Sequence, residues 1–138
     1  MTARAITVEA YIDAPIEKIW SYWTEPEHIK KWNNASSDWH TPHASNDLRT
    51  GGEFLTRMES RDGSQGFDFT GTYTAVEQDK RIEYVMTDGR KVSVAFEPKG
   101  RGINVIETFD PESINPPEMQ KGGWQAILDN FKAYVLAN

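Results

Sequence analysis

The chain has 138 residues and a formal net charge of −6. It contains no cysteine, which excludes disulfides, thiol nucleophiles and thiolate metal sites. No basic stripe points to nucleic acid or an anionic membrane, and no run approaches the roughly 20 apolar residues of a membrane-spanning helix. The N-terminal stretch has no apolar region typical of a signal peptide. We therefore expect a cytoplasmic protein in which residues 1–138 form one domain.

The first third of the chain predicts a strand, two helices and a loop. Residues 5–13 alternate, with Ile6, Val8, Ala10 and Ile12 on one face, as in a strand. Pro15 suits the start of a helix, and Ile16, Ile19, Trp20 and Trp23 then form one apolar stripe. Thr24 and Glu27 have capping-box spacing, which predicts a second short helix. Residues 33–47 are rich in Asn, Ser, Asp, His and Pro, and we expect a long loop there.

Strand patterns dominate from there to residue 109. Apolar and polar residues alternate in the stretches GEFLTRMES, FDFTGTYTAVE, RIEYVMT, KVSVAFE and INVIETF. Turn signals such as Asp62–Gly63 and Asp88–Gly89 separate consecutive stretches. Such short connections predict an antiparallel meander.

A long helix is predicted at the C-terminus. From about residue 118 the apolar period becomes helical, with a stripe of Trp124, Ile127, Leu128, Phe131, Tyr134 and Val135. Gly122 and Gly123 weaken the start of this helix, or instead let it approach the sheet closely. This helix is the only predicted element long enough to cover the inner face of the sheet.

This order of elements resembles the START-like (Bet v 1-like, SRPBCC) superfamily. The stretches that carry the resemblance are APIEKIWSYWTEPEHIKKW at 14–32, DLRTGGEF at 47–54 and GWQAILDNFKAYV at 123–135. Within the superfamily the chain is similar to the branch named for the C-terminal domain of the activator of the Hsp90 ATPase. The resemblance implies an α+β helix-grip fold, in which a curved antiparallel sheet wraps the last helix and leaves a cavity. Relatives in the superfamily bind lipids, sterols or aromatic polyketides, and some are cyclases or hydrolases.

The stretch at residues 37–52 leaves several interpretations open. His40 and His43 lie close to Asp38 and Asp47, so a metal site is conceivable, although no fourth ligand is apparent. The alternatives are a hydrogen-bonded surface loop and the rim of a cavity. The Gly51–Gly52 pair lacks the context of a phosphate loop, and we interpret it as a tight turn or bulge.

Glu107 is the most informative carboxylate. Strand alternation places it with Ile103, Val105 and Phe109 on the predicted inner face. A buried carboxylate is either paired or has a raised pKa, and such groups in pockets are functional candidates. The alternative is a bulge or strand end that turns the side chain to water.

We predict a binding module for a small apolar or aromatic molecule, held between the sheet and the last helix. The predicted wall consists of Trp23, Met58, Phe69, Tyr73, Tyr84, Phe96, Trp124 and Phe131. Trp39 and His40 are expected at the entrance, and Glu107 supplies polarity. No catalytic residue, metal or cofactor is assigned. The alternatives are a chaperone-interaction module and a cyclase- or hydrolase-like enzyme that uses Glu107 or His40 as acid–base.

Overall fold

The computed structural model describes residues 4–138, which form a strand, two short helices, six further strands and a long helix. The strands are β1 (Ile6–Ile12), β2 (Trp39–Asn46), β3 (Glu53–Ser60), β4 (Gly66–Glu77), β5 (Arg81–Met86), β6 (Lys91–Lys99) and β7 (Gly102–Phe109). The helices are α1 (Ile16–Thr24), α2 (Pro26–Trp32) and α3 (Pro117–Ala137).

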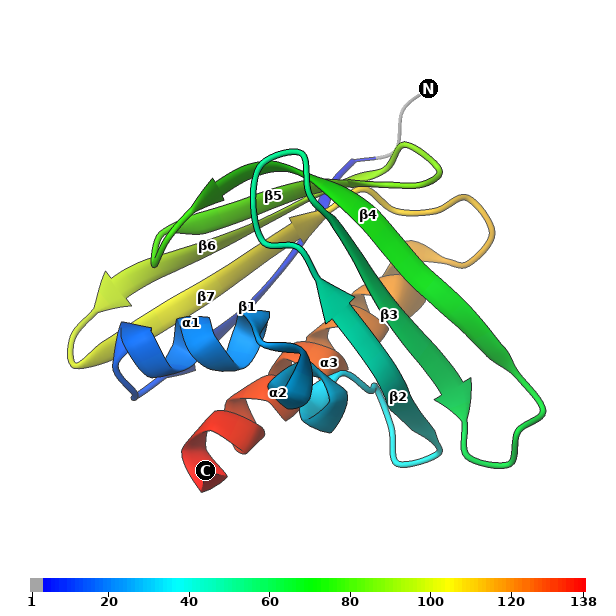
Figure 1. Ribbon diagram of the computed structural model, residues 1–138, viewed down its shortest axis with the longest axis horizontal. Coiled ribbons are helices and arrows are strands. Elements are labelled where there is room, and N and C mark those ends of the chain that lie inside the picture. The colour runs from blue at the N-terminus through cyan, green and yellow to red at the C-terminus, as the bar shows by residue number, and fades with distance from the viewer. Residues whose placement is uncertain (1–3) are drawn as a thin grey trace.

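The strands form one curved antiparallel sheet in the order β1-β7-β6-β5-β4-β3-β2. Figure 1 shows the sheet arching over α3, with α1 and α2 lying on the same concave side. Every neighbouring pair except β1 and β7 is consecutive in the chain, so the sheet is a meander closed by the first strand. The predicted α+β helix-grip architecture is confirmed.

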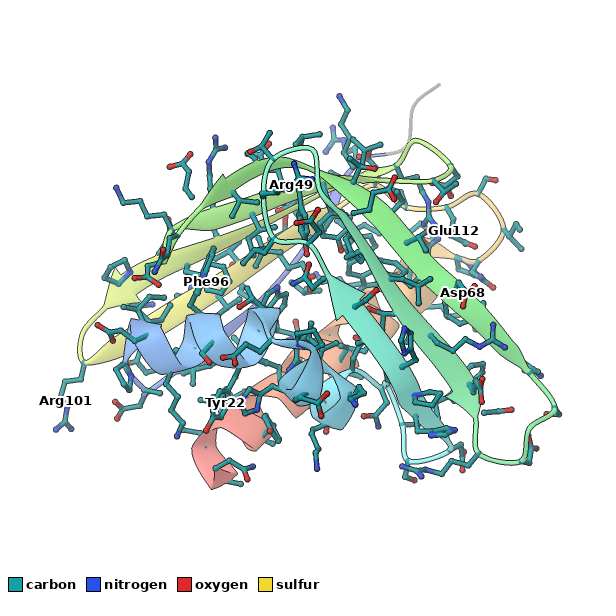
Figure 2. All side chains as sticks on the ribbon, viewed as in Figure 1. Tyr22, Arg49, Asp68, Phe96, Arg101 and Glu112 are labelled. Atoms are coloured by element: carbon teal, nitrogen blue, oxygen red, sulfur yellow. The ribbon has the colours of Figure 1, made fainter. Side chains whose placement is uncertain are left out.

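The hydrophobic core lies between the concave face and the helices. Alternation along β7 buries Ile103, Val105 and Phe109, as predicted. From α3, Leu128, Phe131 and Val135 are fully buried against this face. Burying one such side chain stabilises the fold by about 1.5–3 kcal/mol, so the stripe on α3 holds the helix in place. In Figure 2, Phe96 lies between the sheet and α1, whereas Arg101 projects from the turn after β6.

The start of α2 differs from the prediction. Thr24 is the last residue of α1, and its hydroxyl donates a hydrogen bond of 2.8 Å to the carbonyl oxygen of Trp20. The N-cap of α2 is Glu25, whose side chain makes no capping bond. The predicted capping box is therefore wrong. Pro26 begins α2 instead, because its fixed φ suits the first helical position.

The prediction of a loop at residues 33–47 is also wrong for residues 39–46, which form β2. This strand pairs with β3 in antiparallel register, from Trp39 opposite Ser60 to Asn46 opposite Phe54. It lies at one edge of the sheet, where polar residues can face solvent. Pro42 lies within the register shift between His40 and His43, so its missing N–H interrupts no ladder.

The Gly51–Gly52 turn is structural, as interpreted from the sequence. Gly51 has φ +88°, and a Cβ on Gly52 would lie 2.1 Å from the carbonyl oxygen of Asp47. The Gly51 N–H donates to the carbonyl of Tyr73 at 2.8 Å, and the Tyr73 N–H donates to Gly52 at 2.9 Å. The turn is thereby hydrogen-bonded to β4.

The two glycines of α3 do not serve close packing. A Cβ at Gly122 or Gly123 would meet nothing within 4 Å, so the suggestion that they let the helix approach the sheet is wrong. Both lie within α3, immediately before the stripe begins at Trp124. Within residues 4–138, no helix combines the length and apolar character that crossing a membrane requires.

Candidate ligand-binding cavity

A cavity of about 310 Å³ lies between the concave face of the sheet and the helices. This volume is within the usual range for small-molecule sites. Its wall is mostly apolar and aromatic: Trp23, Trp32, Phe54, Phe67, Phe69, Tyr73, Tyr84 and Trp124 contribute rings. Ile29, Met58, Ile82 and Ile127 add aliphatic surface, and Asn33, Thr56, Arg90 and Glu107 add polar groups.

The wall on the helix side is held by ring contacts. Trp23 and Trp32 lie with ring centroids 5.0 Å apart, and both make edge contacts with Phe131 at 4.9 Å and 4.8 Å. The indole N–H of Trp32 donates to the carbonyl oxygen of Tyr22 at 2.8 Å. These contacts fix the two indoles, so this part of the cavity is formed before any ligand binds.

The sheet side is held by a second group of rings. Phe54 makes an edge contact with Tyr84, with centroids 4.8 Å apart, and lies 5.7 Å from Phe69. Phe69 in turn contacts Trp124 at 6.3 Å, which connects the sheet to α3 across the cavity. The aromatic rings therefore surround the space from both layers.

Glu107 projects from β7 into the cavity. The residue is 7% exposed, and its strand neighbours Val8 and Val94 are 1% exposed. Burial raises the pKa of Glu107 to about 8, and within residues 4–138 no group donates a hydrogen bond to its carboxyl or pairs with it. At neutral pH the carboxyl is therefore mostly protonated, and it is a polar group available to a ligand.

Tyr73 and Tyr84, which both line the cavity, differ in the hydrogen bonding of their hydroxyls. The Tyr73 hydroxyl donates to Oδ1 of Asn46 at 2.5 Å, and burial raises its pKa. Burial also raises the pKa of Tyr84, and the nearby charge of Glu107 adds to this effect. Among the described residues, the Tyr84 hydroxyl has no hydrogen-bond partner. Tyr84 and Glu107 thus form a neighbouring pair of uncommitted polar groups in the cavity.

Arg90 brings a positive charge to the lining. Its Nε lies 2.8 Å from Oδ2 of Asp88, and its backbone N–H donates to Oδ1 of the same carboxylate. The backbone hydrogen bond from Arg90, aided by its guanidinium, lowers the pKa of Asp88. The guanidinium is therefore already paired within its own turn.

The structure brings seven of the predicted site residues to the cavity: Trp23, Met58, Phe69, Tyr73, Tyr84, Glu107 and Trp124. Phe96 and Phe131 are 3% and 0% exposed and lie in the core beside it instead. Trp39 lies beside the lining residue Phe67, with ring centroids 6.0 Å apart. His40 lies opposite Glu59, with Nε2 4.0 Å from Oε1, and is not part of the lining.

The site assignment from sequence missed several lining residues. Phe54, Thr56, Phe67 and Ile82 stand at inward positions of predicted strands, so alternation carried a signal for these. Trp32 is the last residue of α2 and is 5% exposed. Arg90 follows the Asp88–Gly89 turn, where alternation does not fix side-chain direction. Among residues 4–138, no group of three or more His, Asp or Glu side chains could hold a metal ion.

Residues 13–136 match the family model described as Activator of Hsp90 ATPase homolog 1-like protein. The chain belongs to this family. None of the curated proteins with which the chain was compared matches it. The resemblance seen in the sequence is therefore confirmed, and it covers nearly all of the chain.

Two solved structures combine high identity with the same fold. The solution structure of an activator-like protein of this family from Aeromonas hydrophila is 51% identical, with a TM-score of 0.91, covering 97% of this chain and 93% of that chain. A protein from Cytophaga hutchinsonii is 53% identical, with a TM-score of 0.84, covering 96% and 92%. A protein from Nitrosomonas europaea has a TM-score of 0.82 at 20% identity, covering 96% and 94%, and shares the fold.

Proposed function

We propose that this protein binds a small apolar or aromatic molecule in the cavity between the sheet and α3. The observation that carries the proposal is a pre-formed, ring-lined cavity of about 310 Å³ with an uncommitted carboxyl inside it. A cavity this size in a chain of 138 residues costs stability, because its lining loses packing contacts. A ligand that fills the space restores those contacts.

The indole groups offer a direct test. The chain has five tryptophans, of which Trp23, Trp32 and Trp124 line the cavity, whereas Trp20 and Trp39 do not. Naphthylmethanol and decanol, an aromatic and an aliphatic probe, are titrated while the indole N–H resonances are recorded. We expect saturable shifts for the three lining indoles and smaller shifts for the other two. Equal shifts of all five, or none, would contradict binding in the cavity.

A matched pair of variants controls for surface binding. Ile127→Phe adds a ring at a lining position of α3, whereas Leu136→Phe makes the same kind of addition at a position that is 54% exposed. We expect Ile127→Phe to weaken probe binding by about tenfold or more, equivalent to about 1.4 kcal/mol. Leu136→Phe should leave binding unchanged.

The other two candidate functions stay predictions. The family description names an activator of a chaperone ATPase, and a chaperone contact is consistent with it. Catalysis by Glu107 or His40 has less support, because the cavity does not bring these two side chains together. Binding in the cavity is therefore the function that the geometry supports best.

A further inference from the structure

The carboxyl of Glu107 is a buried acid without a basic partner. It lies between Val8 and Val94 on the concave face, and burial alone accounts for its raised pKa. A carboxylate in such surroundings is costly unless a positive charge or hydrogen-bond donors accompany it. Since no positive charge or hydrogen-bond donor among residues 4–138 acts on this carboxyl, a ligand that carries a positive charge can supply the missing interaction.

The rings around the carboxyl suit a cation as well. Trp23, Phe69, Tyr84 and Trp124 lie on opposite sides of the cavity, from α1, two strands and α3. The faces of aromatic rings carry partial negative charge and attract ammonium groups, most strongly where water is excluded. The wall that accepts an apolar body can thus also surround a positively charged nitrogen.

The other charged groups do not oppose a cation. The titratable groups that line the cavity besides Glu107 are Tyr73 and Tyr84 from the sheet and Arg90 from the β5–β6 turn. Tyr73 is bonded to Asn46, and Arg90 is paired with Asp88. The helices contribute no charged side chain to the lining. The net charge of −6 attracts cations to the protein as a whole.

We propose that the cavity selects amines: small molecules that carry one protonated nitrogen on an aromatic or aliphatic body. This inference rests on the proposed function and names its ligand class. In the complex, the carboxylate of Glu107 pairs with the ammonium group, and the Tyr84 hydroxyl accepts a hydrogen bond from it. The proton that Glu107 carries in the empty protein passes to solvent when the amine binds.

A neutral ligand is the competing outcome. The protonated carboxyl of Glu107 and the Tyr84 hydroxyl could both donate to a carbonyl or alcohol oxygen. The two ligand classes have opposite pH dependence. A cation needs Glu107 ionised, so its affinity rises with pH as the carboxyl loses its proton. An oxygen acceptor needs Glu107 protonated, so its affinity falls over the same range.

The experiment compares two probes of nearly the same shape. Naphthylmethylamine carries an ammonium group where naphthylmethanol carries a hydroxyl, and affinities are measured by calorimetry from about pH 6 to about pH 8. We expect the amine to bind at least about tenfold more tightly at the upper end. Its affinity should rise with pH while that of the alcohol falls. An amine affinity that falls with pH, or equals that of the alcohol throughout, overturns the inference.

Two variants assign the selectivity to one carboxyl. In Glu107→Gln the preference for the amine should drop to within about twofold, with the alcohol still bound. Glu97→Gln removes the same charge from an exposed position on β6 and should keep the preference. A preference that survives in Glu107→Gln overturns the inference. Alcohol binding at the lining indoles reports on the proposed function separately, since it can persist when amine selectivity fails.

Discussion

Trp124 on α3 stacks on Phe109 at the end of β7, with ring centroids 4.0 Å apart and ring planes inclined by 8°. The indole is therefore held on one side by the core and faces the cavity on the other. Phe109 itself is fully buried. The stack fixes the N-terminal half of α3 against the strand that carries Glu107, so it couples the stability of the helix to the shape of the cavity.

We expect Trp124→Ala to lower the free energy of unfolding by roughly 2–4 kcal/mol, because it removes both the stack and the packing of a large ring. Urea unfolding monitored by circular dichroism measures the loss. Trp39→Ala is the comparison, since Trp39 makes its aromatic contact with the exposed ring of Phe67. A loss for Trp124→Ala no larger than that for Trp39→Ala would contradict a structural role for the stack.

Glu107 makes stability depend on pH. Its pKa is about 8 in the folded protein, against 4.5 for an ordinary glutamate, so the folded state holds the proton more tightly. The stabilising contribution of this proton is complete below pH 4.5 and is lost as the pH rises towards 8. The free energy of unfolding should fall by at most about 1.4 kcal/mol per pH unit in this window.

Replacing the carboxyl of Glu107 by an amide tests its contribution to the pH dependence of stability. We expect Glu107→Gln to remove most of this pH dependence and to be more stable than the wild type at neutral pH, because the amide, unlike the carboxyl, does not have to take up a proton when the chain folds. Urea unfolding at several pH values measures both effects, and Glu97→Gln should follow the wild-type curve. A Glu107→Gln variant that is less stable at every pH would indicate a bonded, structural carboxyl. A gain in stability with a loss of ligand selectivity is the behaviour expected of a functional residue.

The sequence predicts the inner face of the sheet well, because alternation is a local property. Glu107 was placed on the inner face from its spacing with Val105 and Phe109, and the structure confirms this burial. Alternation does not say which part of that face a helix covers. Phe96 was predicted in the cavity wall, but Trp20 and Trp23 of α1 pack against it at 5.4 Å and 5.9 Å and enclose it in the core.

The edge of the sheet was harder to predict. The composition of β2, with His40, Pro42 and His43, matches that of a loop, since an edge strand pairs on one side and tolerates polar residues and proline. Its pairing with β3 depends on long-range contacts that no local pattern reveals. The metal interpretation of its histidines finds no support, because no group of three or more possible ligands comes together among residues 4–138.

Two partly buried hydrogen bonds connect the sheet to α1 near the cavity. The Tyr73 hydroxyl donates to Asn46, whose Nδ2 donates to the carbonyl oxygen of Thr24 at 2.7 Å. We expect Tyr73→Phe to lower the free energy of unfolding by about 1–2 kcal/mol, because it leaves the Asn46 oxygen without its donor. Thermal unfolding of Tyr73→Phe beside Tyr11→Phe, at a partly exposed position, measures the difference. Equal stability of the two variants would contradict the prediction.

Gly122 and Gly123 weaken α3 without any packing benefit. Since a Cβ at either position meets nothing within 4 Å, Gly122→Ala and Gly123→Ala should each raise the free energy of unfolding by about 0.5–1 kcal/mol. Gly52→Ala is the contrasting control, because its Cβ would lie 2.1 Å from the Asp47 carbonyl oxygen, and we expect a loss instead. Urea unfolding measures all three. If the alanines in α3 destabilise the protein, the helix is not continuous through the two glycines.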